Sequence, residues 1–233
     1  MRHNTPTTPR AIALLSGGLD SCVATAEAVA SHGIQVAALH VSYGQRTARR
    51  ERAAFDAIAD HFGIVERLAT DIGYLAKMGG SSLTDEQLPI PEDDSPGTDA
   101  TQVPTTYVPF RNANLLSIAV SWAEVLGATE IYCGAHAPGS AYPDTQPPFF
   151  AAFQTLIDVA TPEMVDIRLQ TPLLHLDKTG IVRRGVDLGA PFGLTWSCYA
   201  DESTPCGHCH SCHLRQTGFD AAGVDDPLTT STL

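Results

Sequence analysis

The sequence predicts an α/β fold, a Rossmann-like doubly wound parallel sheet, with a small cysteine-bearing subdomain near the C-terminus. Short apolar runs of strand length alternate with segments of helical periodicity, which is the order that builds parallel sheets. A Ser-Gly-Gly turn joins the first strand to the first helix, and four of the six cysteines fall within fifteen residues near the end of the chain. These observations predict one α/β domain with a small appendage.

The first half of the chain alternates strands and helices. The apolar run Ala11–Leu15 has the length of a buried strand, and Cys22–His32 is an alanine-rich helix that ends near Gly33. A second strand follows at Gln35–Tyr43. In Thr47–Phe62, apolar side chains recur every fourth residue, which predicts a helix. In parallel sheets of this kind, ligands bind beyond the carboxyl ends of the strands.

The central segment Gly79–Thr106 breaks this alternation. It is rich in Gly, Ser, Pro and Asp and shows no periodicity, and loops of this length in compact domains are usually functional or disordered. We therefore expect residues 79–106 to form a long mobile loop or lid. Beyond it the alternation returns, with helix 114–126, strand 130–135, helix 149–160, strand 166–170 and helix 178–188.

Composition and charge exclude several classes of protein. Acidic residues outnumber basic ones 26 to 14, for a net charge of −12, which argues against direct binding of nucleic acid because phosphates need a basic surface. The polar segment Met1–Arg10 lacks the apolar stretch of a signal peptide. No apolar run reaches the roughly 18 residues that a membrane span needs. We expect a soluble cytoplasmic protein without membrane contact.

The turn Ser16–Ser21 has the features of a site for a nucleotide polyphosphate. Two glycines let the main chain approach a ligand closely, and free amides at the start of the following helix attract anions. Ser16 and Ser21 add hydroxyl donors, whereas Asp20 suits a Mg²⁺ ion that accompanies phosphate. The turn matches neither the P-loop nor the dinucleotide fingerprint. A plain turn with a capping Ser or Asp is the alternative.

The four clustered cysteines predict a metal site. Paired C-x-x-C spacing in a cytosolic chain favours a metal over disulfides, and four thiolates fit a closed structural zinc site. An iron–sulfur cluster uses the same ligands, so spacing alone leaves it open. Three histidines lie among the cysteines, but four cysteines complete the metal's coordination without them. The candidate ligands are Cys198, Cys206, Cys209 and Cys212.

The glycine-rich turn resembles the pyrophosphate loop of the N-type ATP pyrophosphatases, which split ATP into AMP and pyrophosphate. The sequence Ser-Gly-Gly-Leu-Asp-Ser after an apolar strand carries this resemblance. It implies an adenine nucleotide alpha-hydrolase-like fold, with a nucleotide-binding domain at residues 10–190 and a zinc-binding subdomain at residues 191–220, packed as one unit. The ATP-binding residues that it implies are Leu15, Ser16, Gly17, Gly18, Leu19, Asp20, Ser21, Cys22, Val23 and Ala24.

Further motifs, together with the cysteines, resemble the 7-cyano-7-deazaguanine synthase family over most of the chain. Each motif is short, but their order and the cysteine spacing make the match specific. The motifs are Tyr43-Gly44-Gln45-Arg46, Tyr107-Val108-Pro109-Phe110-Arg111-Asn112, Tyr142-Pro143-Asp144, Thr171-Pro172-Leu173, Asp177-Lys178, Thr195-Trp196-Ser197-Cys198-Tyr199 and Leu214-Arg215.

This resemblance implies an ATP-dependent carbon–nitrogen ligase that converts 7-carboxy-7-deazaguanine and ammonia to the nitrile, on the way to queuosine or archaeosine. Two ATP would be cleaved to AMP and pyrophosphate, through an acyl adenylate and an amide. The resemblance also implies one structural Zn²⁺ per chain, Mg²⁺ with ATP, and a homodimer. The implied catalytic residues are Asp20, Arg111 and Lys178, and the implied substrate contacts are Tyr142 and Asp144.

Three positions depart from the family pattern. Phe110 replaces the usual glycine before Arg-Asn, while Gln146 and Pro148 replace an arginine and a glutamate. These changes leave open a related amide or nitrile ligase for another carboxylate. A second alternative is a PP-loop tRNA-thiolating enzyme with a C-terminal iron–sulfur site, and a third is a non-catalytic zinc-ribbon module on a degenerate nucleotide fold.

Overall fold

A computed structural model describes residues 8–92 and 103–230. Its centre is one parallel sheet of five strands in the order β3-β2-β1-β4-β5, which confirms the predicted doubly wound architecture. The chain moves outward from β1 in both directions, so the topological switch point lies between β1 and β4. The strands are β1 Ala11–Leu14, β2 Val36–Ser42, β3 Arg67–Asp71, β4 Glu130–Tyr132 and β5 Arg168–Gln170.

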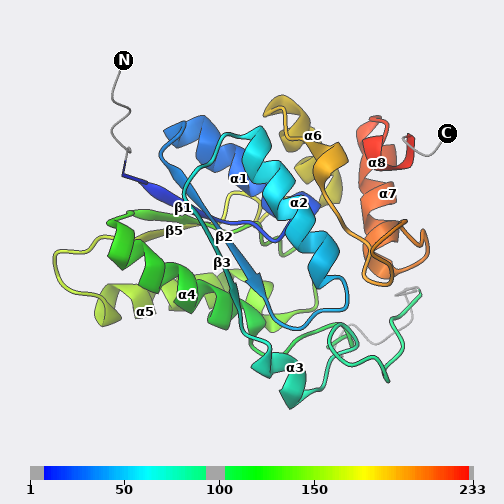
Figure 1. The fold of residues 1–233 in the computed structure, drawn as a ribbon, viewed down its shortest axis with the longest axis horizontal. Coiled ribbons are helices and arrows are strands. Elements are labelled where there is room, and N and C mark those ends of the chain that lie inside the picture. The colour runs from blue at the N-terminus through cyan, green and yellow to red at the C-terminus, as the bar shows by residue number, and fades with distance from the viewer. Residues whose placement is uncertain (1–7, 93–102, 231–233) are drawn as a thin grey trace.

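Two pairs of helices cover the two faces of the sheet (Figure 1). One pair is α1, Leu19–His32, with α2, Ala48–His61; the other is α4, Arg111–Leu126, with α5, Pro147–Ala160. Because successive side chains on a strand point to opposite faces, β1 serves both layers: Ile12 packs in the α4–α5 core, whereas its neighbours pack in the α1–α2 core.

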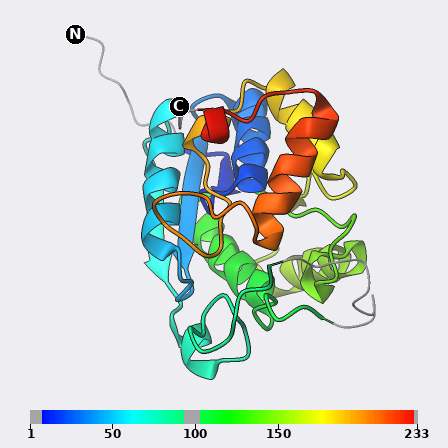
Figure 2. The same cartoon turned by 90° about the vertical axis from the view of Figure 1, so that its right-hand side faces the viewer.

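The C-terminal part of the chain joins the same body. Helix α6 spans Lys178–Asp187, α7 spans His210–Ala222 and the short α8 spans Pro227–Thr230. Phe219 on α7 is fully buried in a cluster that also holds Leu19 and other α1 and α6 side chains. Figure 2 shows α7 alongside α6, with the cysteine-bearing loop leading into it.

Several helices begin earlier than the sequence indicated. Helix α1 begins at Leu19 rather than at residue 22, α4 begins at Arg111 rather than at residue 114, and α5 begins at Pro147 rather than at residue 149. Proline suits a first helical position because it has no amide to satisfy there. The first turn of α4 is polar, and that of α1 has Leu19 next to Asp20 and Ser21, so neither shows apolar periodicity and both resemble a loop.

Four strands and α-helices of the described residues escaped prediction: β3, α3, α7 and the four-residue α8. Strand β3 is an edge strand whose residues are half-buried or exposed, so it lacks the apolar run that marks a strand. The five-residue helix α3, Tyr74–Met78, is too short for a periodic pattern. Helix α7 begins among cysteines and histidines, whose spacing indicates a metal-binding loop rather than a helix.

The expected mobile segment 79–106 is described only in part, because residues 93–102 lie outside the described ranges. Its described portions contain buried residues, including Ser81, Ser82 and Thr106. Arg46 donates hydrogen bonds from its guanidinium to the carbonyl oxygens of Asp85 and Leu88. Within the described ranges, no helix is both long and apolar enough to cross a membrane.

Candidate active site

A cavity of about 300 Å³ opens at the carboxyl ends of β1, β2 and β4, beside the switch point of the sheet. This is the position where doubly wound sheets bind ligands. Its walls come from elements far apart in the sequence: the loop before α1, the first turns of α4 and α6, the segment after β4, and the segment that leads into the cysteines. Polar and charged side chains therefore converge on one hollow.

The glycine-rich turn has a fixed shape that only glycine permits at its second position. Gly17 has φ +95°, and a Cβ there would lie 2.4 Å from the carbonyl oxygen of Glu51 on α2. The hydroxyl oxygens of Ser16 and Ser21 lie 3.0 Å apart. The main-chain amide of Trp196 donates to the carbonyl oxygen of Gly17 at 2.9 Å. The turn is thus held from α2 and from the C-terminal segment.

Helix α1 presents its N-terminus to this cavity. Its N-cap residue is Gly18, which has no side chain to cap the helix. The first amides of the helix therefore remain available to an anion, and the helix dipole adds to the attraction.

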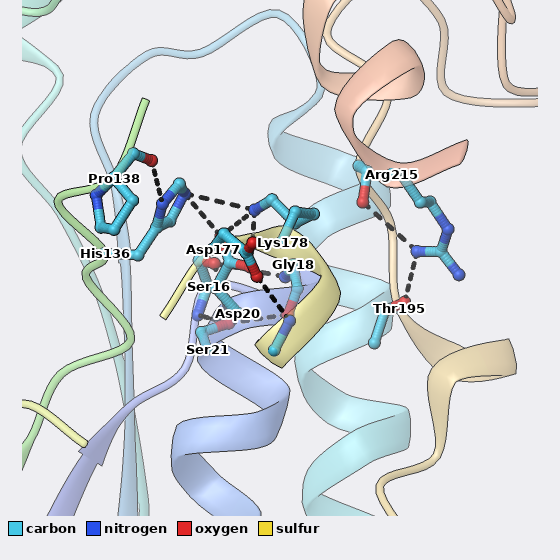
Figure 3. A network of polar contacts seen from close by, with 12 residues as sticks. Ser16, Gly18, Asp20, Ser21, His136, Pro138, Asp177, Lys178, Thr195 and Arg215 are labelled. Carbon is cyan, nitrogen blue, oxygen red and sulfur yellow. Dashed lines mark hydrogen bonds and ion pairs between the residues drawn. The ribbon is translucent and has the colours of Figure 1, made fainter. Parts of the chain in front are cut away.

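The two predicted charged residues Asp20 and Lys178 are paired across the cavity wall. Lys178 Nζ lies 2.8 Å from each carboxylate oxygen of Asp20 and 3.3 Å from His136 Nε2 (Figure 3). Burial alone would raise the pKa of Asp20, but Lys178 and His136 more than offset it, so that the pKa lies below its ordinary value. Asp20 therefore carries its negative charge at neutral pH.

Arg111 supplies a second cation to the cavity, from the first turn of α4. It donates a hydrogen bond to the Tyr43 hydroxyl at 2.9 Å, and its guanidinium carbon lies 4.9 Å from the centre of that ring. Burial alone would lower the pKa of Arg111, but the phenols around it, Tyr43 first among them, raise it above its usual value. Arg111 therefore stays charged although it is enclosed.

The two expected substrate contacts occupy different positions. Tyr142 lines the cavity, and its hydroxyl lies 2.6 Å from Thr106 Oγ1. Asp144 is buried and is not among the lining residues. Its Oδ2 accepts a hydrogen bond from the main-chain amide of Asn112 at 3.0 Å. It thereby satisfies an amide in the first turn of α4, a helix whose N-cap residue makes no side-chain cap.

The structure shows the backbone conformation or the position of each residue that departs from the family pattern. Phe110 has φ 56°, the only positive value outside glycine among the described residues, which is the conformation that glycine adopts without strain. Gln146 donates from Nε2 to the carbonyl oxygen of Ser140 at 2.8 Å, so its amide is directed to the loop backbone. Neither Gln146 nor Pro148 is among the residues that line the cavity.

The ten residues implied as ATP-binding divide into two groups. Six of them line the cavity: Leu15, Ser16, Gly18, Leu19, Asp20 and Ser21. The other four contribute to the loop or to the core behind it: Gly17, Cys22, Val23 and Ala24.

The four clustered cysteines meet in space. Their sulfur atoms all lie within 4.8 Å of one another, and those of Cys206 and Cys212 are 4.0 Å apart. Tetrahedral zinc with Zn–S bonds of about 2.3 Å places sulfurs about 3.8 Å apart, so this set has the donors and the spacing of such a site. The neighbouring histidines are not part of the group. The cluster could therefore hold a metal such as zinc.

The cysteine cluster is tied to the glycine-rich turn. Trp196 is buried in one apolar cluster with three of the cysteines and with Ala54 of α2. Its main-chain amide donates a hydrogen bond to the carbonyl oxygen of Gly17. Glu202, in the loop between the cysteines, accepts hydrogen bonds from the main-chain amides of Arg49 and Arg50 at 3.0 and 3.2 Å. The loop thus caps the start of α2, the helix that packs closely against Gly17 in the glycine-rich turn.

Sequence reasoning gave no role to several residues that line the cavity: Tyr43, Glu51, His136, Tyr199 and Arg215. A usable signal existed for His136, since it follows strand β4 at the carboxyl edge of a parallel sheet. Arg215 is buried and pairs with Asp226 through two contacts of 2.6 and 2.8 Å. Its charge is therefore already neutralised within the protein.

Comparison with known proteins shows the family to which the chain belongs. The family model described as queuosine biosynthesis protein QueC matches residues 10–223. A 7-cyano-7-deazaguanine synthase from Chlorobium phaeobacteroides is 50% identical over 94% of this chain and 96% of that protein. One from Chlorobaculum parvum is 49% identical over 94% and 95%. An NMN synthetase structure from Francisella tularensis gives a TM-score of 0.47 at 14% identity, covering 94% of this chain and 79% of that one. The chain therefore belongs to the QueC family of queuosine biosynthesis proteins.

Proposed function

We propose that the protein converts 7-carboxy-7-deazaguanine and ammonia to 7-cyano-7-deazaguanine, with two ATP cleaved to AMP and pyrophosphate. Relatives that match nearly its whole length carry the name of this synthase. The observation that supports the chemistry best is the cavity itself. It combines the Ser-Gly-Gly turn and the uncapped start of α1 with the Asp20–Lys178 pair and the enclosed Arg111.

The reaction needs ATP because a carboxylate is a poor electrophile and ammonia would only take up its proton. Attack of a carboxylate oxygen on the α-phosphorus forms an acyl adenylate and releases pyrophosphate. Ammonia then displaces AMP to form the amide. A second ATP activates the amide oxygen in the same way, and loss of AMP with two protons leaves the nitrile. The protein contributes positioning and charge stabilisation rather than a covalent intermediate.

The residues of the cavity suit these tasks. The main chain of Gly17 and Gly18 and the hydroxyls of Ser16 and Ser21 would bind the pyrophosphate at the start of α1. Asp20 would hold the Mg²⁺ that accompanies ATP and neutralises phosphate charge. We assign stabilisation of the negative charge that develops on the phosphates to Lys178 and Arg111, both of which line the cavity.

On the substrate side, we propose that Tyr142 contacts the deazapurine directly, since it lines the cavity. Asp144 would act through Asn112, a lining residue that it holds by two hydrogen bonds. The four cysteines would hold one structural Zn²⁺, which shapes the segment behind the glycine-rich turn. We further propose that the enzyme works in the cytoplasm as a homodimer, on the pathway to queuosine or archaeosine.

One assay tests the proposal directly. The purified protein is incubated with ATP, Mg²⁺, ammonium and 7-carboxy-7-deazaguanine, and the products are identified by mass spectrometry. We expect the nitrile with two AMP for each molecule formed. Formation of ADP instead of AMP would refute adenylation whatever the substrate. Elemental analysis should give about one zinc per chain, whereas iron in its place would favour the tRNA-thiolating alternative.

A further inference from the structure

The imidazole of His136 lies on the wall of the cavity beside the expected phosphate site. It follows β4 at the switch point, and its Nε2 lies 3.3 Å from Lys178 Nζ and 3.7 Å from Asp20 Oδ2 (Figure 3). Lys178 makes its two shorter contacts, 2.8 Å each, with Asp20. The contact with His136 is therefore the one that Lys178 gives up most readily.

The surroundings of His136 define its tautomer and its charge. Nδ1 lies 3.3 Å from the carbonyl oxygen of Pro138, which can only accept, so Nδ1 carries the hydrogen and Nε2 the lone pair. Burial lowers the pKa of His136, Lys178 and His210 lower it further, and Asp20 partly offsets them. The net result is a neutral imidazole at physiological pH whose lone pair is directed to the pair of charged groups.

Four other lining groups that could accept a proton, Asp20, Glu51, Cys133 and Tyr43, are occupied or protonated. Both oxygens of Asp20 accept from Lys178, and the two oxygens of Glu51 accept from Thr47 Oγ1 and from Gln45 Nε2. Burial raises the pKa of the Cys133 thiol to about 11 and that of the Tyr43 phenol to about 12. Among the described residues that line the cavity, His136 provides the only imidazole.

We propose that His136 is the general base of the amination step. This role rests on the proposed function. As the ammonia nitrogen uses its lone pair to form the C–N bond, the bond from carbon to the AMP oxygen breaks and its electron pair leaves with AMP. One N–H proton passes to Nε2 of His136, forming an imidazolium that returns the proton to solvent after AMP departs. The step consumes no redox equivalent, and its products are the amide, AMP and one proton.

The test separates adenylation from amination in the full-length protein. Exchange of labelled pyrophosphate into ATP, with the carboxylate present and ammonia absent, reports adenylation alone. Single-turnover formation of amide and nitrile, at constant free ammonia from pH 5.5 to 8.5, roughly the range in which an imidazole titrates, reports amination. The variant is His136→Gln, whose amide can accept the hydrogen bond from Lys178 but does not titrate. The control is His61→Gln, which alters an exposed histidine at the far end of α2.

A general base contributes about 10²- to 10⁴-fold to a rate. In His136→Gln we expect the amination rate, divided by the rate of pyrophosphate exchange, to fall at least about 100-fold. We also expect the decrease of the amination rate at acid pH, seen in the wild type, to disappear. An unchanged ratio with this decrease retained would overturn the proposal. An equal fall of both rates would also overturn it, because His136 would then only position Lys178. Absence of exchange in the wild type would instead refute the proposed function, and the role of His136 with it.

Discussion

Lys178 donates hydrogen bonds to both carboxylate oxygens of Asp20, each at 2.8 Å, and so joins the start of α6 to the start of α1. Both side chains are only partly exposed, to the cavity, so the pair is screened less than a surface ion pair. The pKa of Asp20 lies below its ordinary value because of Lys178 and His136, despite burial. The interaction thus stabilises the fold above the pKa of the unfolded chain, and this contribution is lost as pH falls through the folded pKa.

Substitution Lys178→Met should therefore raise the pKa of Asp20. Burial still raises this pKa, whereas the charge and the hydrogen bonds of Lys178, which lower it, are lost. An NMR titration of the Asp20 carboxyl carbon measures the change. We also expect turnover to fall at least about 100-fold, since the charge on the phosphates would lose a partner. Lys77→Met, at a residue that does not line the cavity, is the control. A pKa of Asp20 that stays low in Lys178→Met would contradict the electrostatic account.

Gly17→Ala should disrupt the glycine-rich turn more than a comparable change elsewhere. Gly33 is the matched control: it also has positive φ, but a Cβ there would meet nothing within 4 Å, whereas at Gly17 it would meet backbone at 2.4 Å. Gly33→Ala should lower the free energy of unfolding by about 1–3 kcal/mol, the cost of a sparsely populated backbone conformation with positive φ. Gly17→Ala should cost more than this and should abolish pyrophosphate exchange. Equal losses in denaturant unfolding would argue against the close contact with α2.

Phe110→Gly should relieve backbone strain, because Phe110 has φ 56° and an exposed side chain. Phe110→Ala is the matched control, since it removes the same ring but keeps a Cβ in the left-handed conformation. We expect the glycine variant to be more stable than the alanine variant by about 1 kcal/mol in denaturant unfolding. If the alanine variant is equally stable, the main chain at residue 110 does not hold the left-handed conformation in solution.

The sequence predicted four of the five strands, all but β3, and the glycine-rich turn, because these depend on local signals. The apolar runs of β1 and β2 are each continuous in the sequence and predict buried strands. The glycines directly after β1 predict a turn with free amides at the start of a helix. Strand β3 gave no such signal because an edge strand needs no apolar run. The pairing of Asp20 with Lys178 could not be derived from spacing either, because 158 residues separate them in the chain.

The position of Asp144 shows a different limit of sequence reasoning. The substrate contact of Asp144 stays a prediction, whereas its hydrogen bond to the Asn112 amide of α4 could not be predicted from the sequence. A carboxylate suits recognition of a base and also suits a main-chain amide, so the residue type alone does not predict the contact with α4. Phe110 is the converse case, since the difference from the family glycine was visible in the sequence while its positive φ was not.

Removal of the zinc proposed for the cysteine cluster should weaken both the fold and the proposed binding of ATP. Trp196 packs in one apolar cluster with the cysteines, and its main-chain amide donates a hydrogen bond to the carbonyl oxygen of Gly17. Treatment with a zinc chelator in excess Mg²⁺ should lower Tm, change tryptophan fluorescence and raise the Kd for ATP. Added Zn²⁺ should restore all three, and added Mg²⁺ alone should not. Loss of zinc with an unchanged Kd for ATP would show that the cluster and the turn are independent.

The buried ion pair Arg215–Asp226 should stabilise the fold, a role called the structural lock, rather than bind phosphate. Both side chains are at most 5% exposed, and Arg215 also donates to Thr195 Oγ1 at 2.7 Å, next to Trp196. Removal of one partner leaves a buried charge unpaired, so Asp226→Asn should cost about 3–5 kcal/mol in the free energy of unfolding. The control is the exposed pair Arg52–Asp56, for which Asp56→Asn should cost at most about 0.5 kcal/mol.

The double variant Arg215→Met with Asp226→Leu distinguishes the two roles of Arg215. It removes both charges, so much of the stability lost in Asp226→Asn should return, because a buried ion pair replaced by apolar side chains is often nearly neutral. If the lock is the role of Arg215, the Kd for ATP should recover together with stability. If the double variant is stable but binds ATP at least about tenfold more weakly, Arg215 contacts the nucleotide. Its pairing with Asp226 would then be the resting state of a group that binds phosphate.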